Sequence, residues 1–274
     1  MDFLLSTGSL YTYGLSRCFA LAADAGFDGM ELLIDERWDT RQAAYVRSLM
    51  DRYGLPVRVV HSPFRPIRGW AIEEETRIRK SAALAEALGA EVVVHHLPVR
   101  FGYGLVTLGT RRWILPLPIW PMGRAYRTWI EDGYVAFQQE TAPTLCIENM
   151  PARHTLGRRW NAHHWNTVPA FIRFESVTMD TTHLGTWDLD PVAVYETWGA
   201  RVKHVHLSNF DGREHRRPES GHLDLGRLLA ALRASGYEGA VTLELSPGGL
   251  AAGCPDDEMR DRLAASLAWC RAQM

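Results

Sequence analysis

The sequence predicts a closed (β/α)8 barrel that forms one domain over residues 1–274, and three observations lead to this fold class. Six short apolar runs are β-branched and bounded by Pro, Gly, Asn or Ser, which is typical of buried parallel strands. Segments of helix length separate these runs, and two further strands complete a set of eight. All six runs end on His, Asp or Glu, which favours a barrel rim over the single switch point of an open sheet.

The predicted strands leave room for a helix between each pair of neighbours. Residues 3–6 open the chain, and residues 29–34 follow the first helix. The six strands with polar ends are residues 57–61, 92–95, 145–148, 177–180, 205–206 and 241–244. No Gly-rich dinucleotide motif or phosphate loop competes with this assignment.

Helical periodicity fills the intervening segments. Several of these helical segments end at a glycine just before the next strand, and glycine forms a left-handed helix cap at no steric cost. These glycines are Gly26, Gly54, Gly89 and Gly236. The predicted helices are residues 18–25, 40–52, 72–88, 125–140, 192–198, 223–235 and 256–271, with a shorter one within residues 161–174.

Composition limits the classes of protein that the chain can belong to. A net charge of −2 gives no general nucleic-acid signature, and the four cysteines show no paired spacing, which indicates reduced thiols. The N-terminus has no signal-peptide pattern. The longest apolar stretch, residues 114–122, is nine residues long with three prolines and is too short to span a bilayer. We therefore expect a soluble, cytoplasmic protein without a membrane partner.

One segment, residues 99–124, is far longer than an ordinary connection between a strand and a helix. It contains four aromatic residues and four arginines but no Asp or Glu. Two interpretations remain open. The segment is either an irregular excursion that packs on the barrel or on another subunit of a homo-oligomer, or a lid that contacts an anionic or sugar-like substrate.

The polar strand ends predict a metal site, because the carboxyl ends of barrel strands face one another across the mouth. The residues expected to converge are His61, His95, Glu148, Asp180, His206 and Glu244, with His183 three residues after Asp180. Mixed imidazole and carboxylate ligands suit a divalent ion such as Mn²⁺, Mg²⁺, Co²⁺ or Zn²⁺. The set contains no thiolate, which argues against a structural zinc.

Short motifs in a fixed order extend this pattern along nearly the whole chain. They are Gly26-Phe27-Asp28-Gly29-Met30-Glu31, Val60-His61-Ser62-Pro63, Val94-His95, Ile147-Glu148-Asn149, Asp180-Thr181-Thr182-His183, His204-Val205-His206-Leu207-Ser208, His215-x-x-Pro218-x-x-Gly221-x-Leu223-Asp224 and Leu243-Glu244. In these motifs the chain resembles the sugar phosphate isomerase/epimerase superfamily, which has a xylose isomerase-like barrel and includes the metal-dependent apurinic-site endonucleases.

The resemblance implies an enzyme of carbohydrate metabolism with one metal ion held by Glu148, Asp180, His206 and Glu244. Such an ion acidifies the carbon next to a substrate carbonyl and stabilises the enediolate that forms. Glu148 and Glu244 are the natural catalytic pair for removing and returning that proton. The expected activity is therefore a sugar, sugar-acid or polyol-derivative isomerase or epimerase, and the same site could support dehydration.

The remaining polar residues divide into three groups. Substrate binding or additional metal binding is expected for His61, His95, His183 and His215, whereas His96 is expected to point away from the barrel axis. Glu31 is assigned equally to substrate contact or an ion pair, and His204 to the barrel interior. Anion binding at the mouth is expected for Arg153, Arg158 and Arg213.

Two alternative functions are kept. The endonuclease branch uses nine ligands, and its pattern is matched at eight of them, namely His61, His95, Glu148, Asp180, His183, His206, His215 and Glu244. At the ninth position Arg213 replaces an aspartate and would repel a cation, so nucleic acid is an improbable but open partner. The second alternative is a catalytically silent barrel that binds a metabolite.

Overall fold

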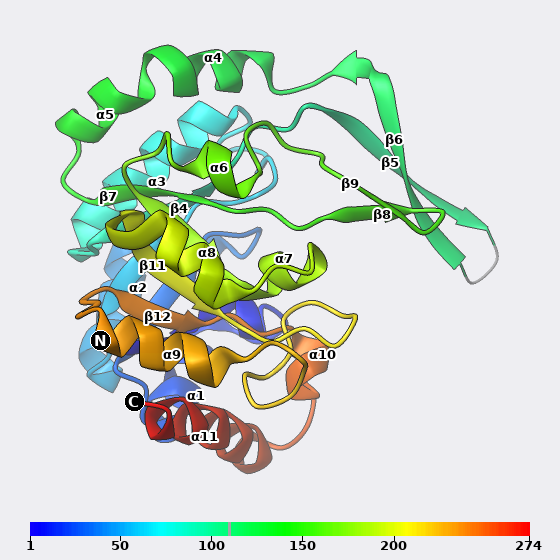
Figure 1. The fold of residues 1–274 in the computed structure, drawn as a ribbon. Coiled ribbons are helices and arrows are strands. Elements are labelled where there is room, and N and C mark those ends of the chain that lie inside the picture. The colour runs from blue at the N-terminus through cyan, green and yellow to red at the C-terminus, as the bar shows by residue number, and fades with distance from the viewer. Residues whose placement is uncertain (109–110) are drawn as a thin grey trace.

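A computed structural model describes the backbone of residues 1–108 and 111–274, and their side chains except those of residues 103–121. Within these ranges, eight parallel strands close into a barrel, and the last strand pairs with the first (Figure 1). The predicted (β/α)8 barrel is confirmed. Its strands are β1 (Phe3–Ser6), β2 (Gly29–Leu33), β3 (Val57–His61), β4 (Val92–His96), β7 (Thr144–Glu148), β10 (Val177–Asp180), β11 (Val202–Leu207) and β12 (Ala240–Leu243).

Alternation along each strand sorts the residues into an inner and an outer layer. Leu4, Val59 and Val94 meet inside the barrel. Their neighbours, such as Val60 and Val93, belong to the large core between the barrel and its helices. Residues in phase with the inner set at the carboxyl end of each strand therefore point into the mouth.

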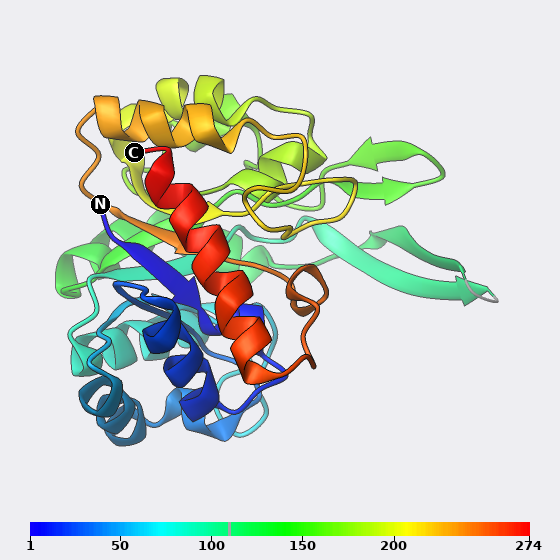
Figure 2. The same ribbon diagram turned by 90° about the horizontal axis from the view of Figure 1, so that it is seen from below.

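The helices form a layer around the barrel, and α1 packs beside α11 next to the first strand (Figure 2). Gly26, Gly54 and Gly89 have positive φ at helix ends, as expected for left-handed caps. None of the described helices combines the length and the apolar character needed to cross a membrane. The helices are α1 (Leu15–Ala25), α2 (Ala43–Tyr53), α3 (Glu74–Leu88), α4 (Arg124–Asp132), α5 (Tyr134–Glu140), α6 (Val168–Phe171), α7 (Thr181–Thr186), α8 (Pro191–Trp198), α9 (Leu225–Ala234), α10 (Pro247–Leu250) and α11 (Asp256–Ala272), with short 3-10 turns at Thr7–Leu10, Trp38–Arg41 and Gly199–Arg201.

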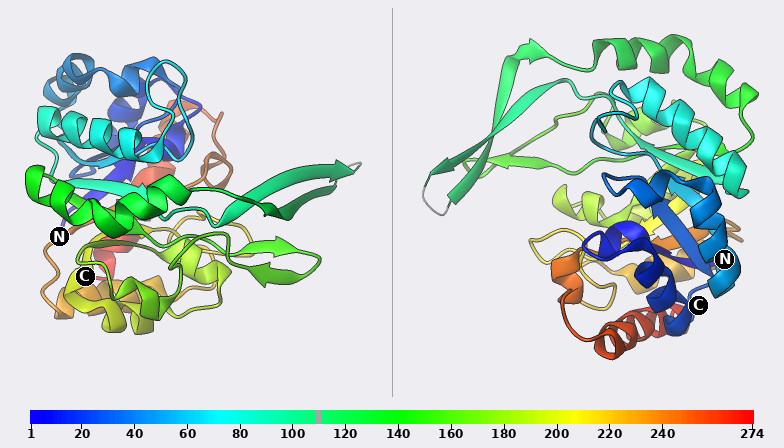
Figure 3. Two further views of the ribbon diagram at one scale, coloured as in Figure 1. Left: turned by 90° about the horizontal axis from the view of Figure 1, so that it is seen from above. Right: turned by 180° about the vertical axis from the view of Figure 1, so that it is seen from behind.

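The long segment for which an irregular excursion and a lid were both left open forms an antiparallel ribbon of β5 (Phe101–Leu108) and β6 (Arg111–Pro121). A shorter hairpin of β8 (Arg153–Thr155) and β9 (Arg158–Trp160) follows β7. Both hairpins project from the same side of the barrel and lie next to each other (Figure 3). The structure does not describe most of the aromatic and arginine side chains counted in residues 99–124, namely those of Tyr103, Arg111, Arg112, Trp113 and Trp120.

Two helix predictions need correction. The helix expected at residues 125–140 is divided at Gly133 into α4 and α5, and an atom of the Trp129 ring lies 3.0 Å from where a Cβ of residue 133 would be. The helix expected within residues 161–174 is restricted to α6. The preceding residues form a loop in which the Asn166 amide bonds both the N–H and the carbonyl of Met150.

Candidate metal centre at the barrel mouth

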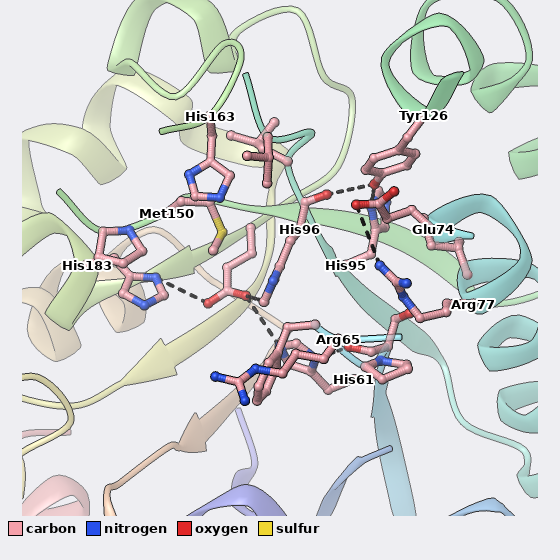
Figure 4. A pocket seen from close by; sticks show the side chains of 18 of the residues that line it. His61, Arg65, Glu74, Arg77, His95, His96, Tyr126, Met150, His163 and His183 are labelled. Carbon is pink, nitrogen blue, oxygen red and sulfur yellow. Dashed lines mark hydrogen bonds and ion pairs between the residues drawn. The ribbon is translucent and has the colours of Figure 1, made fainter. Parts of the chain in front are cut away.

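The carboxyl ends of the barrel strands surround a pocket of about 340 Å³, within the order of 300–1,000 Å³ that small-molecule sites occupy. His61 and His96 line it from β3 and β4, and His183 lines it from α7 (Figure 4). Glu148 at the end of β7 and His215 in the loop after β11 line it as well. Most of the residues that the sequence singled out therefore line the pocket, and His96 joins His95 there on β4.

Three carboxylates face one nitrogen, Nδ1, of the His206 imidazole. Its Nδ1 lies 3.1 Å from Glu148 Oε1, 3.1 Å from Glu244 Oε2 and 3.8 Å from Asp180 Oδ2. These residues come from four adjacent strands, since Glu244 directly follows β12. One potential ligand atom from each lies within 4.8 Å of the others, which is compatible with a single cation between them. The structure thus brings together the four residues predicted to hold a metal.

Electrostatics inside this cluster also fit a cation. Burial and the charges of Glu148 and Glu244 raise the pKa of Asp180 well above its ordinary value. Burial also acts to raise the pKa of Glu148 and Glu244, but the neighbouring imidazoles together outweigh it, so the pKa of Glu148 falls well below its usual range and that of Glu244 falls to about 2. His206 acts on both glutamates, His61 and His96 also act on Glu148, and His215 also acts on Glu244. Asp180 Oδ2 is buried and has no hydrogen-bond partner among the described residues. A divalent ion would satisfy this oxygen and relieve the crowding of carboxylates.

Glu148 lies at the centre of the wider histidine cluster. Its Oε1 is 3.1 Å from His206 Nδ1 and 3.4 Å from His183 Nδ1. Its Oε2 is 3.0 Å from His96 Nε2 and 3.3 Å from His61 Nε2. Glu148 is consequently shared by two possible metal groups, the four-residue set around His206 and a second set with His61 and His96.

Backbone carbonyls orient three of the histidines toward the pocket. The Nδ1 atoms of His61, His183 and His215 lie 2.8, 2.7 and 3.1 Å from the carbonyl oxygens of Ser62, Asn149 and Glu244. A carbonyl can only accept, so each Nδ1 carries a proton. Each Nε2 is then left for a ligand, which is the arrangement that metal-binding histidines usually show.

The loop that carries His215 is fixed by Asn209. The Asn209 side chain accepts from the N–H groups of Phe210 and Leu223 and donates to the carbonyl of Pro218. At Gly221, φ is 144° and a Cβ would lie 2.3 Å from Asn209 Oδ1, so only glycine fits there.

The structure differs from the predictions for His95 and His96: both line the pocket, but His96 and not His95 belongs to a group of possible metal ligands. His95 points outward, where Nδ1 lies 2.9 Å from the Tyr126 hydroxyl and Nε2 lies 3.0 Å from the Tyr134 hydroxyl. Burial lowers the pKa of His95 to about 3, so it is a neutral core residue. The strand continues to His96, which is in phase with the inward Val94 and reaches Glu148.

The arginines predicted to bind anions are separated in the structure. Arg153 lines the pocket. Arg158 is exposed on β9, and the Arg213 side chain is 72% exposed and paired with Asp211. Neither Arg158 nor Arg213 is among the described residues that line this pocket.

Several pocket residues were not singled out in the sequence. Arg65 and Phe64 follow β3, and Arg77 lies on α3. Phe64 is 54% exposed and stacks on His96, with ring centroids 5.8 Å apart. Glu214 occupies the position beside Arg213 and its Oε2 lies 3.9 Å from His183 Nε2. The sequence offered one signal for these residues, namely their position. Phe64 and Arg65 directly follow the motif that contains His61, and Glu214 directly follows Arg213.

His163 is a buried imidazole directed toward the pocket (Figure 4). Burial, reinforced by the charges of His96 and Arg153, lowers its pKa to about 3. Its Nδ1 has no hydrogen-bond partner among the described residues. His163 was not singled out in the sequence, because its place over the mouth depends on the backbone pairing with the distant Val99.

Glu31 lies in the barrel interior below this cluster. Its Oε2 is 3.0 Å from His206 Nε2 and 2.8 Å from His204 Nε2. Burial alone would raise the pKa of Glu31, but the two imidazoles hold it well below the usual value. Of the two alternatives left open for Glu31, the contact seen is the ion pair, and His204 lies in the barrel interior as expected.

A family model described as a xylose isomerase-like TIM barrel matches residues 19–273. The chain belongs to this family. The match to the xylose isomerase-like TIM barrel includes all strands from β2 to β12 and therefore every residue of the metal cluster. Uncharacterised proteins of Mycobacterium bovis and Mycobacterium tuberculosis are each 26% identical to this barrel over 98% of the chain and 96% of their own length.

Several solved xylose isomerase-like folds have a similar structure, and three of them each cover 99% of this chain with 99% of their own. A D-tagatose 3-epimerase-like protein has a TM-score of 0.65 at 21% identity. The 3-keto-D-glucoside 4-epimerase of E. coli has a TM-score of 0.68 at 20% identity. An AP endonuclease of family 2 from Brucella melitensis has a TM-score of 0.64 at 20% identity. These similarities establish the shared fold.

Proposed function

We propose that the chain is a metal-dependent isomerase or epimerase that acts on a sugar, a sugar acid or a related polyol derivative. The observation that carries the proposal is the arrangement around His206. Glu148, Asp180 and Glu244 meet there at the mouth of the barrel, and Asp180 Oδ2 lacks a hydrogen-bond partner among the described residues. Sugar epimerases among the similar structures support this choice of reaction class.

Glu148, Asp180, His206 and Glu244 would hold the divalent ion. When bound, such an ion polarises a substrate carbonyl and acidifies the adjacent C–H group. The chemistry of the ligand set, with three carboxylates and one imidazole, suits a hard or borderline ion such as Mn²⁺, Mg²⁺, Co²⁺ or Zn²⁺.

Glu148 and Glu244 are assigned to proton transfer at the substrate carbon. Their pKa values lie below the ordinary range, so both are ionised at neutral pH and either can accept a proton. β10 and β11 separate the two glutamates around the barrel wall, so they would approach a substrate from different sides. One of the two carboxylates removes the proton from the substrate carbon. Either this residue or its partner, in the protonated form, then returns a proton to the carbon.

His183 is assigned to a substrate hydroxyl. Its Nδ1 is held by the Asn149 carbonyl, which leaves Nε2 for the pocket. Burial lowers its pKa to about 4, so the ring is neutral at pH 7 and its Nε2 accepts a hydrogen bond from a hydroxyl. The surrounding buried side chains exclude water, which strengthens such contacts.

Solvent isotope exchange tests the proposed reaction. A panel of ketoses, aldoses and sugar acids is incubated in D₂O with Mn²⁺-loaded protein, and deuterium next to the carbonyl is followed by NMR. We expect exchange with at least one substrate and a loss of at least about 100-fold in Glu148→Gln and Glu244→Gln. The exposed Glu238→Gln is the matched control. Undiminished exchange in both site variants would remove the assigned pair.

A second candidate, phosphodiester hydrolysis at abasic DNA, is favoured by one observation. Besides the set around His206, His61 with His96 and Glu148, and Asp180 with His183 and His215, form further groups of possible ligands. The measurement that separates the candidates is metal content with an incision assay. About one ion per chain and no incision supports the isomerase, whereas about three ions and chelator-sensitive incision of an abasic duplex supports the nuclease.

A further inference from the structure

The barrel interior directly beneath the metal cluster contains a buried carboxylate that the proposed reaction does not use. Glu31 is fully buried on β2, and its side chain reaches across to β11. Its Oε2 lies 2.8 Å from His204 Nε2 and 3.0 Å from His206 Nε2. An ionised carboxylate can only accept hydrogen bonds, so both imidazoles carry a proton on Nε2.

His206 is oriented differently from its neighbours in the site. In His61, His183 and His215 the Nδ1–H group donates to a backbone carbonyl, and Nε2 is the ring nitrogen that remains for a ligand. In His206 the Nε2–H group donates to the Glu31 carboxylate, and Nδ1 faces Glu148 and Glu244 at 3.1 Å each. The carboxylate therefore reverses which ring nitrogen points into the cluster.

We propose that Glu31 is a positioning residue that selects Nδ1 of His206 as the metal ligand. Without this carboxylate the neutral ring would place its proton on Nδ1, where Glu148 and Glu244 both accept. A proton would then occupy the direction in which the ion needs a lone pair. Glu31 prevents this, because its own hydrogen bond holds the proton on the opposite side of the ring.

His204 donates a second hydrogen bond to the same Glu31 oxygen and so holds it in place. It is fully buried, and its Nε2 also lies 3.1 Å from the Thr242 hydroxyl. The carboxylate is thus fixed from β11 by two imidazoles that alternate along the strand on the same face, so neither ring can rotate without breaking a buried hydrogen bond.

The proposal rests on the proposed function only in assuming a divalent ion at the His206 cluster, so its test measures binding and not turnover. Mn²⁺ is titrated into the metal-free protein by calorimetry. We expect Glu31→Gln to raise the dissociation constant about 10- to 100-fold, which is the usual effect of losing an orienting partner of a ligand. Glu31→Asp keeps the negative charge, but its shorter side chain places the carboxylate farther from His206, so a similar loss of Mn²⁺ affinity is expected.

Thr242→Val is the matched control. It removes a hydroxyl that contacts His204 but leaves Glu31 and His206 joined, so affinity within about twofold of the wild type is expected. Unchanged Mn²⁺ affinity in a folded Glu31→Gln, with a circular dichroism spectrum like that of the wild type, would overturn the assignment.

A spectroscopic measurement on the wild type decides the question even if both Glu31 variants fail to fold. In ¹⁵N-histidine-labelled, Zn²⁺-loaded protein, His206 should show a metal-bound Nδ1 and a protonated, slowly exchanging Nε2. A metal-bound Nε2 overturns the proposal. Metal binding without turnover on any sugar defeats the proposed reaction and leaves Glu31 in its role, whereas absence of any divalent-ion binding defeats both.

Discussion

Asp180 uses its two oxygens for different purposes. Oδ1 accepts from the N–H of His183 at 2.7 Å and begins α7, whereas Oδ2 faces Glu148, Glu244 and His206. An asparagine at this position keeps the helix cap but removes a carboxyl group whose ionised form is disfavoured by burial and by the charges of Glu148 and Glu244.

We therefore expect Asp180→Asn to separate stability from metal binding. The metal-free variant should be more stable than the wild type by about 1 kcal/mol, a rise of about 2–4 °C in Tm for a chain of this size, because the wild type loses stability at neutral pH by burying a carboxyl group whose pKa is raised. Its Mn²⁺ affinity should fall at least about tenfold. Calorimetry and thermal unfolding measure both quantities. A variant that is less stable and binds Mn²⁺ as tightly would contradict this account of the cluster.

His95 predicts an acid-sensitive core. Its pKa is about 3 in the folded protein and near 6.5 when unfolded, so between these values the unfolded chain binds a proton that the folded chain does not. Its contribution to stability is complete above about pH 6.5 and is lost by about 1.4 kcal/mol per pH unit as the pH falls toward 3.

The variant His95→Gln should remove this dependence. Its free energy of unfolding, measured by urea denaturation from pH 7 to pH 4.5, should fall less steeply than that of the wild type. His154→Gln, at an exposed position, should retain the wild-type slope. Parallel slopes for wild type and His95→Gln would show that His95 is protonated in the folded state.

At the scale of elements, the β5–β6 ribbon has no barrel strand beside it. It is a two-stranded sheet of its own, with strands of 8 and 11 residues, and it reaches about 25 Å at a rise of about 3.3 Å per residue. Isolated two-stranded ribbons are marginally stable in water. The sequence of this ribbon is strongly apolar, which favours the interface interpretation over the lid.

We expect the ribbon to contact a second copy of the chain. Replacing residues 103–120 by Gly-Ser-Gly should leave the barrel folded and its Mn²⁺ affinity unchanged, but should convert an oligomer to a monomer in size-exclusion chromatography with light scattering. Leu156→Ser, at the exposed turn of the neighbouring hairpin, is the control and should keep the wild-type mass. Equal masses for the wild type and the shortened chain would favour a lid or a solvated arm.

Whether an element could be predicted from sequence depended on its length and on what surrounds it. The barrel strands and long helices have apolar patterns that identify them, but α7 and α10 are too short to show a period. β4 is apolar on both faces, so its sequence does not show which residues point into the barrel. Deciding between His95 and His96 required the register of β4 with β7, which only the structure gives. The contact between Glu31 and His204 joins residues 173 positions apart and depends on barrel closure.

At the scale of the whole molecule, the metal cluster links ion binding to global stability. Mn²⁺ at about one hundred times its dissociation constant should stabilise the fold by about 2.7 kcal/mol, because the ion binds the folded and not the unfolded chain. Chelation should reverse the gain, and Asp180→Asn at the same Mn²⁺ concentration should show much less of it. Thermal unfolding with and without the ion measures the effect. A Tm that Mn²⁺ does not change would place the ion elsewhere.

The two chain ends lie close together at the end of the barrel opposite the mouth (Figure 1). The N–H of Phe3 donates to Asp28, and the same carboxylate pairs with Arg271 in α11. A biotin or affinity tag at either end would therefore anchor the molecule by its closed floor and turn the open mouth toward the solution. Tethered in this orientation, the barrel is suited to screening libraries of polyols and sugar acids on a biosensor surface, with immobilisation leaving the entrance free.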